Sequence, residues 1–279
     1  MALNDEIREQ RQKLKGKGKK AYIEYYLEYY LWRAIAVIAA AVLIGSVIHG
    51  FVTDHPDAVY AVLLNCRVID SWVEKEIEGE VGLLLGTNPR KEDVVVETTF
   101  YRTPGTMQGQ ADMATDVKMM ALSGSGDIDL LAADAYLFRD YATAGGMLDL
   151  RDVLDKEELE SLDEEGLIWY LDAGDIHEEG RSEEEAEEYI SAEEGAAFEN
   201  PASFTLPIPE QMKDPIPVGI VLTGRALFEK YGMYPDAVVA AGFPSGTSRL
   251  DNAKVLLEYL MSDDPSAFAA EAALERQTE

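Results

Sequence analysis

The sequence predicts one α/β domain preceded by a single long transmembrane helix. The first observation is an apolar run of twenty residues without a formal charge, Ala34 to Thr53. The second is the alternation of short apolar runs with amphipathic segments after it, which is typical of a sheet connected by crossover helices. The third is length, because the 226 residues from Asp54 to Glu279 suffice for one sizeable core.

The apolar run is interpreted as a membrane anchor. In a helix that rises about 1.5 Å per residue, such a run covers roughly 30 Å, the thickness of the hydrocarbon core of a bilayer. Before it, residues 21–32 (AYIEYYLEYYLW) place tyrosines at helical spacings of three and four, which is typical of an aromatic belt at a membrane interface. A stripe that binds a partner protein is the alternative for these tyrosines. We expect a juxtamembrane and transmembrane helix over residues 21–53.

The charges on either side of the run predict its orientation. Residues 1–33, which begin with a basic tail over residues 1–20, carry eight basic and five acidic side chains, whereas residues 54–279 carry sixteen basic and 48 acidic ones. Cytoplasmic loops next to a membrane helix are enriched in Lys and Arg. We therefore expect a single-pass protein of the cell membrane with a cytoplasmic N-terminus and an extracellular C-terminal domain. A cleaved signal peptide is the alternative, but no clean small-x-small site follows the run.

The composition of the outer domain restricts its partners. Its strong negative charge argues against nucleic acid, since phosphate binding needs basic patches. A single cysteine, Cys66, cannot form an internal disulfide, so the core alone must hold the domain together. We interpret this cysteine as a small buried apolar residue.

Three strands are predicted in the first half of the outer domain. They are short runs rich in apolar, β-branched or aromatic residues, and they cover Ala58 to Leu64, Asp93 to Tyr101 and Ile128 to Ala132.

Helices are predicted around these strands. One covers Arg67 to Glu78 and another covers Thr106 to Ser123. The first is expected to bury Val68, Trp72 and Ile77 on one side. Asp134 is placed to cap a further helix, whose aromatic residues are Tyr136, Phe138 and Tyr141.

The second half contains an acidic insert over residues 161–214, then a strand over Pro217 to Leu222 and a helix over Ser248 to Leu260. Clustered carboxylates can bind calcium, but the insert lacks the alternating oxygen ligands and the turn glycine of an EF-hand loop. Its closest arrangement to a divalent site is formed by Asp172, Asp175, His177 and Glu178. We expect a solvated loop there and predict no metal site and no cofactor.

Catalytic motifs are missing from the sequence. It contains no Gly-x-Ser-x-Gly elbow and no phosphate loop, and Gly124-x-Gly126 is followed by Asp129 where a dinucleotide-binding motif needs glycine. His177 is the one well-placed histidine of the outer domain. We therefore predict no catalytic residues and no enzyme.

The order of the predicted helices and strands in the middle of the chain is similar to that of a known protein family. A helix, the Gly-rich turn Ser123 to Asp127, an apolar strand, a short aromatic helix and the segment Met147 to Leu150 follow one another. This succession resembles the first lobe of bacterial extracellular solute-binding proteins of the type 2 periplasmic-binding class. Pro217 to Leu222 looks like the returning strand of that lobe, and Ser248 to Leu260 looks like its late helix. Residues 21–65 are similar to the anchor and first strand of membrane-tethered relatives in Firmicutes.

The chain departs from that family at the second lobe. In the family a whole lobe is inserted between the two halves of the first, whereas only the acidic residues 161–214 stand there in this sequence. We therefore expect a single-lobe, three-layer α/β/α domain of the type 2 periplasmic-binding-protein-like fold, with closure around a ligand lost or reduced.

The resemblance implies a membrane-anchored extracytoplasmic protein that captures or senses a small solute, such as a sugar or peptide, without catalysis. The alternative is a degenerate binding lobe that acts as a protein–protein interaction module at the cell surface, with a membrane protein as its partner.

Ligands of open α/β sheets lie beyond the carboxyl ends of the strands. That rule selects the ligand-binding candidates Asn65, Arg102, Thr103, Asp134, Tyr136 and Ser245. Structural roles are the alternatives: a helix cap for Asp134, a core or surface aromatic for Tyr136, and a turn for the segment Gly242 to Pro244.

Overall fold

The structure is a computed structural model that describes residues 20, 31, 35–46, 55–67, 71–100, 128–176, 205–235 and 237–278. The predicted helix over residues 106–123, the Gly-rich turn at residues 123–127, and most of the tyrosine-rich segment lie outside these ranges. The chain forms two compact units, Met1–His55 and Pro56–Glu279.

In the first unit, residues 35–46 are helical. The large apolar side chains of this helix, such as Val42 and Leu43, are exposed. Within the residues that the structure describes, no helix combines the length and the apolar character needed to cross a membrane.

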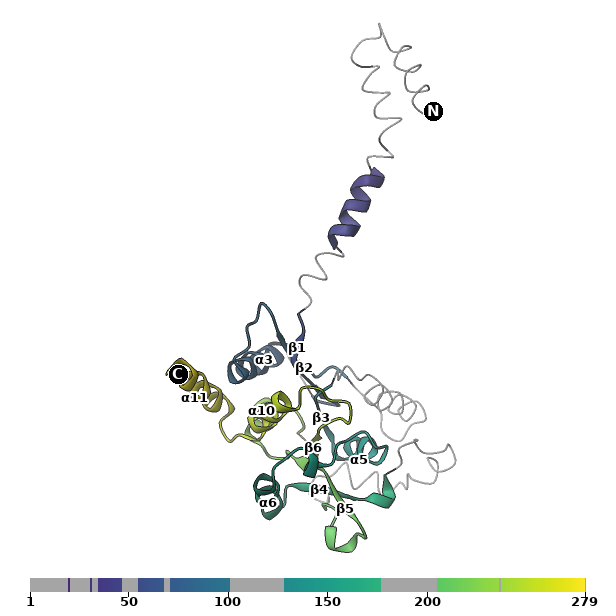
Figure 1. The fold of residues 1–279 in the computed structure, drawn as a ribbon, viewed down its shortest axis with the longest axis vertical. Coiled ribbons are helices and arrows are strands. Elements are labelled where there is room, and N and C mark those ends of the chain that lie inside the picture. Colours follow the sequence, from purple (N-terminus) through teal and green to yellow (C-terminus); the bar gives the residue numbers. More distant parts are fainter. Residues whose placement is uncertain are drawn as a thin grey trace, which may run out of the picture. The chain divides into compact units, whose positions relative to one another are not determined.

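The second unit is built around a six-stranded mixed sheet with the strand order β2-β1-β3-β6-β5-β4 (Figure 1). The strands are β1 (Asp57–Leu63), β2 (Asp93–Glu97), β3 (Leu130–Asp134), β4 (Ile168–Asp172), β5 (Pro215–Val221) and β6 (Val239–Gly242). β1 runs parallel to both of its neighbours, whereas each pairing from β3 to β4 is antiparallel. The predicted α/β class is therefore confirmed.

Helices cover both faces of the sheet (Figure 1). Alternate residues of a strand point to opposite faces, so Val59 and Leu63 join one core with residues of α3, α10 and α11. Val62 joins a second core with residues of α5. The helices are α3 (Ser71–Leu85), α5 (Ala135–Thr143), α6 (Lys156–Glu164), α9 (Ala226–Tyr231), α10 (Leu250–Met261) and α11 (Pro265–Thr278), with the short 3-10 turns η1 (Leu150–Asp152), η2 (Ala173–Asp175) and η4 (Pro209–Gln211).

Most of the predicted elements in the described ranges are present, with shifted ends. β2 stops at Glu97, four residues before the predicted end, and α3 continues to Leu85. The predicted apolar side of α3 is wrong at Trp72, whose surface is 53 % exposed, whereas Val73 and Ile77 are buried. The buried residues of α3 recur every three or four positions from Val73, and Trp72 lies about 100° away from that stripe.

The expected acidic insert, residues 161–214, contains a strand of the sheet. β4 pairs with β5 at one edge, and its Trp169 is only 1 % exposed. The ring of Trp169 packs edge-on against Phe138 of α5, with centroids 5.4 Å apart. Burial of the apolar run Leu167 to Leu171 explains why this segment joins the fold instead of forming a solvated loop.

Candidate functional site

Two predicted site residues meet where the parallel strands β1 and β3 end. Asn65 follows β1, and Asp134 is the last residue of β3. The side-chain amide of Asn65 donates a hydrogen bond to Oδ2 of Asp134 over 3.1 Å. Asn65 adopts φ 56°, a left-handed conformation that Asn tolerates better than most residues. The turn after β1 therefore directs this amide to the end of β3.

Asp134 also begins the next helix. Its Oδ1 accepts a hydrogen bond from the backbone N–H of Leu137 over 3.0 Å, so the predicted cap of α5 is confirmed. Burial raises the pKa of the Asp134 carboxyl, while the hydrogen bonds from Leu137 and Asn65 act in the opposite direction. The Asp134 carboxylate thus binds both the first turn of α5 and the residue that follows β1.

Tyr234 and Cys66 lie beside this pair. The hydroxyl of Tyr234 donates to the backbone carbonyl of Leu64 over 2.9 Å, and burial raises the pKa of Tyr234 well above its ordinary value. Burial, and secondarily the charge of Glu74, raises the pKa of the Cys66 thiol to about 12. Since the thiolate is the reactive form of cysteine, the raised pKa favours the less reactive, protonated thiol at neutral pH.

Two exposed aromatic residues belong to the same edge of the sheet. Phe100 follows β2, and its carbonyl accepts a hydrogen bond from the backbone N–H of Asn65 over 3.0 Å. Trp72 stands in the first turn of α3 and packs edge-on against Tyr231, with ring centroids 5.7 Å apart. Both side chains are exposed to solvent. We call Asn65, Trp72, Phe100, Asp134 and Tyr234 the strand-end cluster.

The remaining predicted residues lie elsewhere. Tyr136 is buried in α5 beneath the guanidinium of Arg139, 5.4 Å from the ring centroid, which matches its alternative role as a core aromatic. Ser245 follows β6, which is antiparallel to β3 and pairs its last residue, Gly242, with Leu131. The carboxyl end of β6 therefore lies at the amino end of β3, so Ser245 is not part of the strand-end cluster. Arg102 and Thr103 lie outside the described residues.

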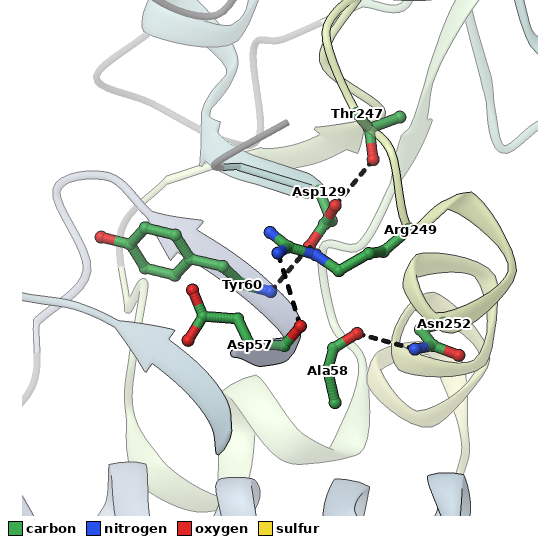
Figure 2. A network of polar contacts seen from close by, with 7 residues as sticks. All are labelled: Asp57, Ala58, Tyr60, Asp129, Thr247, Arg249 and Asn252. Carbon is green, nitrogen blue, oxygen red and sulfur yellow. Dashed lines mark hydrogen bonds and ion pairs between the residues drawn. The ribbon is translucent and has the colours of Figure 1, made fainter. Parts of the chain in front are cut away.

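A second polar network lies at the opposite ends of β1 and β3 (Figure 2). Its centre is Asp129, whose side chain has no exposed surface. The Asp129 carboxylate accepts hydrogen bonds from Arg249 Nε over 2.7 Å, from the Thr247 hydroxyl over 2.8 Å and from the Tyr60 N–H over 2.8 Å. A buried carboxylate requires such partners. The one sequence signal for this network is a charged residue, Asp129, inside the apolar run Ile128 to Ala132.

The strand-end cluster combines hydrogen-bonding groups with two exposed rings, and such a surface can bind a small polar molecule that presents a flat or apolar face. In the described part of the chain, no three His, Cys, Asp or Glu side chains are placed to share a metal ion. No protein-family model, no curated protein and no solved structure matches this chain.

Proposed function

We propose that the chain is a membrane-anchored extracytoplasmic protein of the solute-binding type, which captures or senses a small solute at the cell surface without catalysis. A sugar or a short peptide suits the strand-end cluster best. Hydroxyl and amide groups can bond with Asn65 and Asp134, and the apolar face of a sugar ring or side chain can pack on the exposed rings.

One observation carries this proposal. Trp72 and Phe100 are exposed aromatic residues from different elements. The Phe100 carbonyl bonds to Asn65, which contacts Asp134, and Trp72 lies in the first turn of α3, the helix that follows β1. Exposed aromatic rings are costly in water, and they gather where proteins bind ligands or partners. Polar side chains beside exposed rings at the ends of parallel strands are typical of a small-molecule site in an α/β sheet. A surface that only binds another protein does not need them there.

The arrangement of the sheet supports a single lobe of the type 2 periplasmic-binding-protein-like fold. β2, β1 and β3 form a parallel group, and β5 and β6 return antiparallel beside it. Helices on both faces give the α/β/α layering of such a lobe. The resemblance in the order of elements points in the same direction.

We also propose that residues 34–53 anchor the chain in the cell membrane as a single pass, with residues 1–20 in the cytoplasm. Support comes from the uncharged run and the charge asymmetry on its two sides. The exposed apolar side chains of helical residues 35–46 also fit a lipid environment.

A protein–protein interaction module is the second candidate. Leu83 of α3 is 53 % exposed and Leu274 of α11 is 63 % exposed. The two helices pack together, and Arg276 of α11 donates to the carbonyl of Leu83 over 2.5 Å. Exposed leucines on two helices that pack together are what supports a site for a membrane protein partner.

The test is a thermal-shift measurement on the full chain in detergent, with monosaccharides, oligosaccharides and short peptides at millimolar concentration. A ligand that binds only the folded state raises the melting temperature. We expect a saturable rise with one chemical class, which Trp72→Ala abolishes and Leu83→Ala retains. Leu83 is a matched control because it lies on the same helix and is equally exposed. No rise in a folded sample would favour the interaction module. An equal loss of the rise in both variants would show that Trp72 has no specific part in binding.

A further inference from the structure

The loop between α3 and β2, residues 86–92, lies where the chain enters the second unit. That unit begins at Pro56, and the carbonyl of Pro56 accepts a hydrogen bond from the N–H of Asp93, the first residue of β2, over 3.1 Å. β1 and β2 run parallel, and α3 connects them and packs on β2 (Figure 1). The start of β1, the start of β2 and the end of α3 therefore share one end of the domain. We call residues 86–92 the entry loop.

The entry loop presents two exposed basic side chains, Arg90 and Lys91, followed by one exposed carboxylate, Glu92. A turn fixes their backbone, because Asn88 accepts the Arg90 N–H at its side-chain oxygen over 3.1 Å and the Lys91 N–H at its carbonyl over 2.8 Å. Within the described ranges, neither basic side chain forms an ion pair, whereas acidic partners bind those of Arg151, Lys156, Arg225, Lys230 and Arg249. The entry loop therefore keeps two positive charges that no contact neutralises there.

An exposed apolar side chain and a third basic one belong to the same end of the domain. Leu83, in the last turn of α3, is 53 % exposed. Its carbonyl accepts a hydrogen bond from Nη1 of Arg276 over 2.5 Å, so this guanidinium lies at the end of α3. Basic side chains near exposed apolar ones are typical of protein surfaces that lie in the headgroup region of a membrane.

The length of chain before Pro56 selects the partner of this surface. In the proposed function, on which this inference rests, the membrane anchor ends at Thr53. Only residues 54 and 55 separate Thr53 from Pro56, so Pro56 lies within about 11 Å of the end of the anchor. We propose that the entry loop docks on the membrane that anchors the chain, with Arg90 and Lys91 against the phosphates of anionic lipids and Leu83 at the depth of the headgroups.

The charge of the domain favours this orientation. Residues 54–279 carry 48 acidic and sixteen basic side chains, so an anionic membrane repels most of the surface. It attracts the basic side chains that lie within about one Debye length, roughly 10 Å. The strand-end cluster lies at the opposite end of β1, a strand of seven residues and therefore roughly 20 Å long. Docking thus directs the cluster away from the bilayer, toward the solution from which a solute arrives.

Acetylation of lysines by a reagent that does not cross membranes, read by mass spectrometry, tests the docking. The full chain is placed in vesicles of phosphatidylcholine with about one third anionic phosphatidylglycerol, and the same chain in neutral detergent is the reference. Modification of Lys91 is divided by that of Lys156 in α6, whose side chain is 87 % exposed. Chains that face the vesicle interior lower both values equally, so the ratio reports only on docking.

We expect this ratio to fall about fivefold or more in the anionic vesicles, since each basic side chain near an anionic surface favours the docked state by about fivefold. Salt at about 1 M, which shortens the Debye length to about 3 Å, should restore the ratio. Arg90→Ala should lose most of the protection of Lys91. Arg67→Ala is the matched control and should keep it, because Arg67 is also exposed but follows β1 at the opposite end of the domain.

Extraction of the same vesicles with alkaline carbonate separates this inference from the anchor. A chain that stays in the membrane and shows the detergent ratio would retain the anchor and refute the docking. Equal protection in vesicles of phosphatidylcholine alone would contradict the role of anionic lipid, and an equal loss in Arg67→Ala and Arg90→Ala would contradict the entry loop as the contact. Release of the chain by carbonate would refute the anchor, and the docking with it.

Discussion

Trp72 packs edge-on against Tyr231 with an interplanar angle of 78°, although about half of its surface faces solvent. Tyr231 in turn donates from its hydroxyl to Glu76 over 2.7 Å, and the Lys230 ammonium lies 4.6 Å from the centroid of the Tyr231 ring. The indole therefore packs against an ordered group, while about half of its surface faces solvent.

Replacing each of the two described tryptophans by alanine should have very different costs. Trp169→Ala removes a fully buried ring that packs on Phe138, and should lower the free energy of unfolding by about 3–5 kcal/mol. Trp72→Ala, the control, should cost only about 1 kcal/mol, the scale of one aromatic pair. Urea unfolding followed by circular dichroism gives both values. Equal costs would contradict the burial of Trp169 against Phe138.

Two glycines should respond to alanine in opposite directions. A Cβ at Gly219 would lie 2.2 Å from Cζ of Phe138, whereas a Cβ at Gly79 meets nothing within 4 Å. Gly219→Ala should therefore destabilise the domain by about 2 kcal/mol or more, because the core must be overpacked. Gly79→Ala lies inside α3 and should stabilise it by up to about 1 kcal/mol. Thermal unfolding of the two variants would reveal the signs, and a neutral Gly219→Ala would refute the close approach of β5 to α5.

The Asp134 carboxyl should make stability depend on pH. Folding raises its pKa above the ordinary value of 3.8, so the folded state keeps this proton over a range where the unfolded chain has released it. Stability from this group is therefore present at low pH, and it falls as the pH rises from near 3.8 through the folded pKa.

Asp134→Asn removes this titration and retains a side chain that can cap α5. The difference in unfolding free energy between the wild type and Asp134→Asn should shift against the wild type as the pH rises from 4 to 7. Urea titrations at several pH values measure it. A difference that is independent of pH would contradict the raised pKa.

Cys66 should react slowly in the folded protein. Its pKa of about 12 leaves little thiolate at pH 8, so alkylation by iodoacetamide should be at least about a hundredfold slower than in the chain unfolded by urea. Mass spectrometry follows the modification. Comparable rates before and after unfolding would show that the thiol is neither buried nor raised in pKa.

The proposed anchor predicts a simple fractionation. Membranes that contain the full chain should retain it during extraction with alkaline carbonate, whereas a chain that starts at Asp54 should be released, because residues 34–53 supply the apolar length for insertion. Immunoblotting of pellet and supernatant distinguishes the two chains. Release of the full chain would exclude an integral membrane anchor.

The sequence was sufficient to predict the described strands β1, β2, β3 and β5, and the helices α3, α5 and α10, because each is a compact run with a clear period or a recognisable cap. β4 was harder to predict because its five residues lie inside a strongly acidic region. The acidic composition favoured a solvated loop, although the local run LIWYL is apolar. The mistake at Trp72 arose because the side of α3 that is buried depends on the sheet beneath it.

Part of the candidate site could also be predicted from the sequence, and part could not. Asn65 and Asp134 could be predicted together because the ends of parallel strands meet at one edge. Ser245 could not be placed, because the sequence does not reveal that β6 runs against β3. Tyr234 and Arg249 reach their partners Leu64 and Asp129 across 170 and 120 positions of the chain, and no local pattern encodes such contacts.

Asp129, which directly precedes β3, and Asp134, its last residue, have one consequence for the folding of the sheet. Asp129 bonds to Tyr60 and Asp134 bonds to Asn65, and in each pair the partners are 69 residues apart in the sequence. A slip of β1 against β3 by one residue would break both bonds at once and would turn every side chain of β1 to the opposite face. One such hydrogen bond lies at each end of the paired strands, so both ends favour the native register. In a misaligned intermediate the buried Asp129 carboxylate would lose the hydrogen bond that it accepts from the Tyr60 N–H.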